Sequence, residues 1–124
     1  MKKIPADTPE DSYLKAAVEL EHARNAYDHK RGNKAFDRLM RVAKQIRLTH
    51  HDGGQKFFAS LLTHDMPHVV KAAAFNLIPL DPQLARKTYE RLAKGPPGEV
   101  RLDAEMTLKE WKAGRLDPDW FMKH

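Results

Sequence analysis

Apolar residues recur at steps of three and four along most of the chain, which is the spacing of one face of an α-helix. The first series follows Thr8-Pro9 and reaches Tyr27. Threonine is a good N-cap, and proline suits the first helical turn. The pattern therefore predicts a helix over residues 8–31, which Gly32 and Asn33 would end.

The same spacing predicts five further helices, separated by short segments rich in glycine, proline or aspartate. They cover approximately residues 33–49, 55–62, 66–78, 82–94 and 99–113. The helix over 66–78 is apolar nearly all round and contains three consecutive alanines, so it is expected to be the most buried. No segment alternates apolar and polar residues over the length of a strand. The sequence predicts an all-α fold.

A shift of 31 residues superposes two parts of the chain. It places Phe58 on Tyr89, Leu61 on Leu92, Val69 on Val100, Ala73 on Ala104 and Leu77 on Leu108. Each part reads as a helix, a turn and a second helix that cannot bury both apolar faces alone, so stacking is expected. The predicted single domain has an arm at 1–9, a divergent helix pair at 10–49, repeat units at 55–79 and 82–113, and a C-terminal cap at 117–124.

The string LLTHDMPHVVKAAA, residues 61–74, resembles a short HEAT-like repeat, in which an acidic residue and a proline precede Val-Arg and a pair of alanines. Together with Asp81-Pro82 and the closing LKEWKAG at 108–114, the stretch from about 10 to 116 is similar to a small bacterial HEAT-like family of unknown function. The resemblance implies an α-α superhelix, a right-handed stack of about six antiparallel helices. It also implies protein binding, because HEAT-like folds bind proteins more often than they catalyse.

Positive charge is concentrated in two segments. The chain has 22 Lys and Arg against 17 Asp and Glu, a net charge of +5. Residues 32–52 carry five basic and two acidic side chains, and residues 81–98 carry four basic and two acidic side chains. On a helix, Lys34, Arg38, Arg41 and Lys44 fall on the side opposite the apolar face. These four residues, with Arg86 and Arg91, are the candidate partner-binding residues.

Two classes of partner fit this charge. The leading hypothesis is a non-enzymatic protein-binding module, an adaptor or immunity-type protein, that binds an acidic partner protein. The alternative is a nucleic-acid-binding protein that uses a basic patch on the second and fifth helices to follow a phosphate backbone. Few aromatic residues are free of the predicted core to stack on bases, which favours the first hypothesis.

The sequence shows no catalytic or cofactor-binding signature. It has no cysteine, no Gly-x-Ser-x-Gly elbow and no glycine-rich phosphate loop. Capping explains Asp65, Asp81 and Asp117, each of which shortly precedes a proline. His64 and His68 are four residues apart, but Pro67 would start a helix between them, so these histidines are expected to be solvated or capping, with a metal site near residues 50–68 as the alternative. Neither an enzyme nor a cofactor is predicted.

The two ends of the chain bear on location and assembly. No apolar run has the roughly 18 to 20 residues needed to cross a bilayer, and the first residues lack the apolar core of a signal peptide, so a cytoplasmic protein is expected. Trp120 and Phe121 are apolar residues near a chain end. They would either cover the last helix pair or form a dimer contact, which predicts a monomer or a weak homodimer.

Overall fold

The computed structural model describes residues 7–119 and residue 122 of the chain, and this part is helical without any strand. The predicted all-α class is confirmed. The elements are α1 (Pro9–Asn25), α2 (His29–Thr49), α3 (Gln55–Ser60), the 3-10 helix η1 (Leu61–Thr63), α4 (Pro67–Leu77), α5 (Pro82–Ala93) and α6 (Glu99–Lys112). No described helix has both the length and the apolar character needed to cross a membrane.

The first helix ends six residues earlier than predicted. Asp28 accepts a hydrogen bond from the backbone N–H of Arg31 at 3.1 Å and caps α2, so Gly32 lies inside α2 instead of ending α1. Tyr27 adopts a left-handed conformation (φ 54°) in the connecting turn and is 84% exposed, although its place in the apolar series had put it in the core. A strong N-cap therefore outweighs the helix-ending tendency of glycine and asparagine here.

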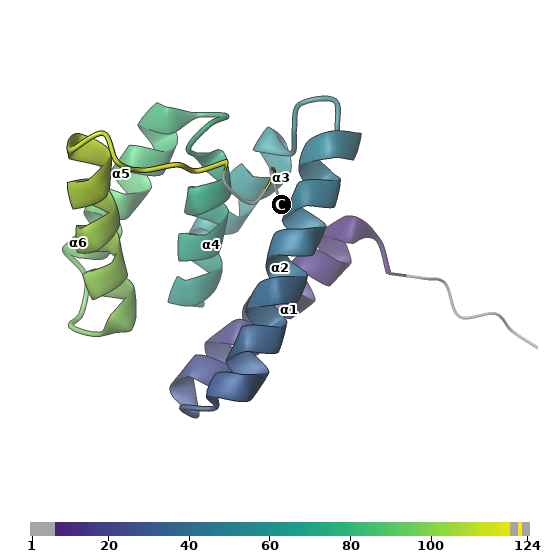
Figure 1. Ribbon diagram of the computed structural model, residues 1–124, viewed down its shortest axis with the longest axis horizontal. Coiled ribbons are helices and arrows are strands. Elements are labelled where there is room, and N and C mark those ends of the chain that lie inside the picture. Colours follow the sequence, from purple (N-terminus) through teal and green to yellow (C-terminus); the bar gives the residue numbers. More distant parts are fainter. Residues whose placement is uncertain (1–6, 120–121, 123–124) are drawn as a thin grey trace, which may run out of the picture.

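Helix α4 lies at the centre of the molecule, where α1, α3, η1, α5 and α6 all pack against it (Figure 1). Eight of its eleven residues are buried, which confirms that it is the most buried helix. Next to it, the rings of Tyr13, Phe57 and Phe58 form an aromatic cluster, with Tyr13 and Phe58 in edge contact at 5.2 Å between centroids. The core thus joins the first helix pair to the later helices.

The two segments related by the 31-residue shift share the order helix, turn, helix, but their first helices differ in length. Helix α3 has 6 residues and continues into η1, whereas α5 has 12 residues. Their second helices, α4 and α6, have 11 and 14 residues, and both pack against α5. The N-cap positions of these two helices also differ: Met66 precedes α4, and Gly98 precedes α6.

The chain turns back after α6 and crosses the end of the later helices toward α2 (Figure 1). Arg115 makes two 2.8 Å hydrogen bonds to Glu110 at the start of this segment. Asp119 accepts a 2.9 Å hydrogen bond from Arg47 of α2 at its far end. Leu116 packs on the core between these two anchors. Trp120 and Phe121, on which the cap or dimer prediction depends, lie outside the described residues.

Candidate functional site

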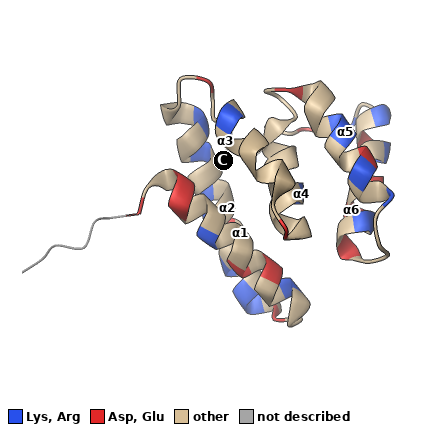
Figure 2. Ribbon diagram, turned by 180° about the vertical axis from the view of Figure 1, so that it is seen from behind, with Lys and Arg blue, Asp and Glu red and all other residues tan. Residues whose placement is uncertain are grey.

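The six predicted contact residues lie on two different helix pairs. Lys34, Arg38, Arg41 and Lys44 lie on α2, which packs on α1, whereas Arg86 and Arg91 lie on α5, which packs on α4 and α6. The Lys and Arg positions of α2 and those of α5 accordingly lie on opposite sides of α4 (Figure 2). The Arg86 guanidinium lies 4.9 Å from the centre of the Trp111 ring, and Arg91 donates to the Leu62 carbonyl at 2.9 Å. The two arginines of α5 therefore take part in contacts within the fold.

A long, open groove runs between α1 and α2 on the surface of the first helix pair. Its volume is about 1100 Å³, and Lys34, Arg38 and Arg41 line its α2 side. We call these three residues the basic stripe. They occupy positions i, i+4 and i+7 of α2, so they point in nearly the same direction. Lys44 lies on α2 outside the groove.

Four other charged residues of the groove are paired with each other. Glu19 of α1 forms an ion pair with Arg31 of α2, and this hydrogen-bonded contact lowers the pKa of the Glu19 carboxyl. Lys15 binds Asp7 at 2.6 Å. The basic stripe, in contrast, makes no ion pair with any described residue. Its positive charge is therefore presented to solvent along one wall of the groove.

The α1 side of the groove carries charged residues and, among them, two aliphatic side chains, Leu14 and Val18, which we call the aliphatic wall. These two residues are four apart on α1 and are half-buried, and Ala35 of α2 lies between the two helices. No Phe, Tyr or Trp is among the described residues that line the groove, and the one ring in this lining is the imidazole of His22. The groove thus combines aliphatic side chains with a row of cations, and His22 is the one described lining residue with a ring on which a nucleic-acid base could stack. Leu14 and Val18 belong to the apolar series of α1, yet they are only partly covered where α2 packs on α1.

A second cleft lies between the first helix pair, α4 and α6. It has a volume of about 440 Å³ and apolar walls that include Phe36, Met40, Phe75 and Met106. Phe36 lines this cleft and is 36% exposed. Two ion pairs cross its polar side, Lys71 with Asp103 at 2.5 Å and Arg24 with Glu99 at 3.6 Å. These pairs connect α6 to α4 and to α1.

His68 is buried rather than solvated or capping, which corrects the prediction for this histidine. It is 5% exposed, and its Nε2 atom lies 3.7 Å from a carboxylate oxygen of Glu21, itself buried on α1. Burial lowers the pKa of His68. Glu21 also accepts the backbone N–H of His68 at 3.2 Å, so a side chain of α1 satisfies the first turn of α4.

The predicted caps are only partly observed. Asp81 accepts the N–H of Leu84 at 3.2 Å and caps α5 as expected. Asp65 makes no capping hydrogen bond to α4; the ring of His64 accepts the N–H of Met66 at 3.0 Å instead. Asp117 accepts the N–H of Asp119 at 3.2 Å, within a turn.

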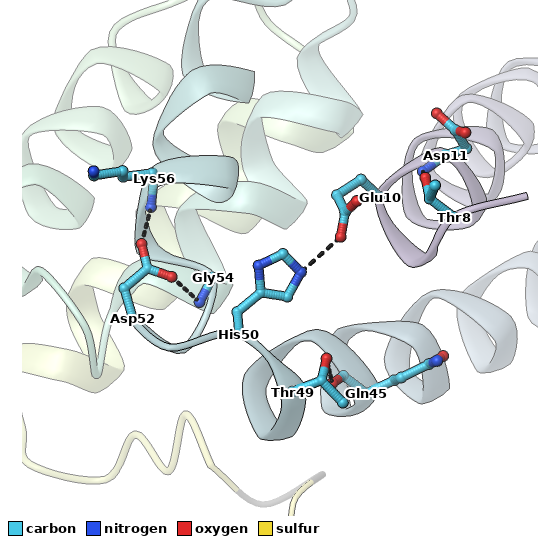
Figure 3. Close-up of polar contacts among 9 residues, drawn as sticks. All are labelled: Thr8, Glu10, Asp11, Gln45, Thr49, His50, Asp52, Gly54 and Lys56. Atoms are coloured by element: carbon cyan, nitrogen blue, oxygen red, sulfur yellow. Dashed lines mark hydrogen bonds and ion pairs between the residues drawn. The ribbon is translucent and has the colours of Figure 1, made fainter.

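Polar contacts fix the loop between α2 and α3 (Figure 3). The ring of His50 points to Glu10 of α1, with 2.6 Å between Nε2 and the carboxylate. Asp52 accepts the backbone N–H groups of Gly54 and Lys56, and these bonds lower the pKa of its carboxyl. Among the described residues, no three His, Cys, Asp or Glu side chains are grouped closely enough to hold a metal ion. These contacts attach the loop to the start of α1.

The described structure defines an all-helical protein with a basic and aliphatic groove on its first helix pair. Comparisons with protein-family models, with curated proteins and with solved structures found no match to this chain.

Proposed function

We propose that the chain is a non-enzymatic protein-binding module whose α1/α2 groove binds an acidic segment of a partner protein. One observation carries this proposal: the three cations of the basic stripe lack ion-pair partners among the described residues, although neighbouring charges in the same groove are paired. Carboxylates of a partner would supply the missing counter-charges, and the aliphatic wall would add apolar contact area.

The proposal extends to the architecture. We propose that the helices form a short HEAT-like stack in which α1 and α2 are the terminal pair. The 31-residue correspondence and the packing of both α4 and α6 on α5 support this arrangement. Within the described part of the chain no further helix pair lies over the α1/α2 groove, so its surface is open to a partner. A bacterial source, which rests on the resemblance, and a cytoplasmic location, which rests on the apolar pattern of the sequence, are part of the same proposal.

Nucleic acid is the competing partner. Its phosphates would also neutralise the basic stripe, but the described lining of the groove contains no Phe, Tyr or Trp and a single imidazole, that of His22. Arg86 and Arg91 are engaged in contacts elsewhere. Phosphate contacts would have to provide nearly all of the affinity, which would then fall steeply with salt. Direct binding measurements separate the two classes.

The test compares an acidic peptide and duplex DNA as fluorescent probes for the purified chain, beginning at about 50 mM salt. The proposal expects the peptide to bind and the double variant Arg38→Glu/Arg41→Glu to lose this binding while its circular dichroism stays unchanged. Lys87→Glu/Lys94→Glu is the matched control, because it changes the net charge equally at two exposed lysines outside the groove. DNA binding without peptide binding would favour the alternative, and equal losses in both variants would exclude the groove as the site.

A further inference from the structure

We infer that the acidic segment bound by the groove is an amphipathic α-helix with carboxylates at steps of three and four residues along one edge. The inference rests on the proposed function and adds the conformation and residue pattern of the partner segment. It follows from the spacing of the basic stripe and from the shape of the groove.

The spacing of the cations matches a helix better than an extended strand. A helix rises about 1.5 Å per residue, so Lys34 and Arg38 are separated by about 6 Å along α2, and Arg38 and Arg41 by about 4.5 Å. A helix lying beside α2 repeats these unequal steps when its acidic residues follow the same three- and four-residue spacing. A strand places side chains of one face about 6.6 Å apart, which fits the first step but not the second.

The aliphatic wall, Leu14 and Val18, requires a second row of residues on the same segment. Leu14 and Val18 are four residues apart on α1, so they also form a line along the groove. A helix can place aliphatic residues next to its acidic edge and contact both walls at once, as helices bound in grooves do. A segment with carboxylates alone would satisfy the basic stripe and leave the half-buried Leu14 and Val18 in water.

The free charges of the groove set the sign of the partner. The pairs Glu19–Arg31 and Asp7–Lys15 neutralise themselves. Among the acidic residues that line the groove, Asp11 alone forms no ion pair within the described structure. The three unpaired cations of the basic stripe therefore face one unpaired carboxylate. A helix with a net negative edge is complementary to this surface, and a basic helix is repelled by it.

The test uses three synthetic peptides of about 20 residues, long enough for some helicity in water. The patterned peptide has glutamates at three- and four-residue steps beside leucines. The shuffled peptide has the same composition with glutamates on all sides, and the third peptide carries a central proline that breaks the helix. Fluorescence anisotropy with the full chain measures affinity, and circular dichroism of each mixture reports helix formation.

The inference expects the patterned peptide to bind about tenfold more tightly than either control, as three charge pairs and an aliphatic contact allow. Binding should raise the helical signal. The variant Arg38→Glu/Arg41→Glu should lose the preference about tenfold, Leu14→Ala/Val18→Ala should lower affinity a few-fold, and Lys87→Glu/Lys94→Glu should bind like the unmodified chain.

Two other outcomes are informative in different ways. Equal binding of all three peptides, lost in Arg38→Glu/Arg41→Glu, would overturn the helical inference and leave the acidic-partner proposal in place. Absence of binding by every peptide would overturn both. If Leu14→Ala/Val18→Ala is misfolded by circular dichroism, Val18→Thr tests the same wall with a side chain of nearly equal size.

Discussion

Gly54 occupies a position where any side chain would meet the core. It has a left-handed conformation (φ 94°) at the start of α3, and an added Cβ would lie 2.6 Å from Ile46 Cγ2 and 2.8 Å from Phe58 Cε2. Both neighbours are completely buried, so neither can move into solvent. The substitution Gly54→Ala therefore combines a strained backbone with an overpacked core.

The two contributions can be estimated separately. A left-handed conformation costs a residue with a Cβ about 1–2 kcal/mol. Overpacking a dense core costs typically about 1–3 kcal/mol. The free energy of unfolding of Gly54→Ala should thus be about 2–5 kcal/mol lower, a large part of the stability of an ordinary domain.

Gly114 provides the matched control. It also has a left-handed conformation (φ 74°), but no atom lies within 4 Å of an added Cβ. Gly114→Ala should lose only the conformational part, about 1–2 kcal/mol. Urea unfolding followed by circular dichroism measures both variants. If Gly54→Ala is destabilised no more than Gly114→Ala, the close approach of residue 54 to Ile46 and Phe58 is not real.

Three further predictions concern buried polar groups. Glu21→Ala should lower the free energy of unfolding by about 1–3 kcal/mol, because it leaves the backbone N–H of His68 without an acceptor. Glu21→Gln keeps an acceptor oxygen and should retain most of the stability in urea unfolding. Because burial lowers the pKa of His68, the unfolded chain takes up a proton there more readily than the folded chain; the free energy of unfolding should fall as pH drops below about 6.5, and less so in His68→Gln. Tyr13→Phe should cost about 1 kcal/mol, because Tyr13 accepts a 2.8 Å bond from the amide of buried Asn76, and a double-mutant cycle with Asn76→Leu should show coupling between the two positions.

Helix existence could be read from the sequence because periodicity is a local property. Apolar spacing, together with prolines at the first turns, located all the main helices of the described chain. The error at the first turn arose from competing local signals. Asp28 stands three residues before Arg31 and is a good N-cap, but the apolar series appeared to continue through Tyr27. The Asp28 cap and the packing of α2 on α1 together favour the earlier break.

The candidate site was predictable to the extent that it lies on one helix. The basic stripe follows from positions i, i+4 and i+7 of a single amphipathic segment. The contacts of Arg86 and Arg91 could not be read in the same way, because Trp111 and Leu62 lie 25 and 29 residues away in the sequence. The buried pair of Glu21 and His68 joins residues 47 apart, and no local pattern distinguishes these side chains from exposed ones.

The basic stripe itself weakens the helix that carries it. Lys34 and Arg38 are like charges at i, i+4, and Arg38 and Arg41 are like charges at i, i+3; each such pair destabilises a helix by about 0.2–0.5 kcal/mol. Arg38→Glu turns both repulsions into attractions, so it should raise the free energy of unfolding by up to about 1 kcal/mol while it weakens binding of an acidic helix. If the basic stripe served only solubility, Arg38→Glu would raise the stability without any loss of peptide binding. Urea unfolding measures the stability of this variant, and fluorescence anisotropy measures its affinity for the acidic peptide. Unchanged peptide affinity would show that the basic stripe is a solvated surface.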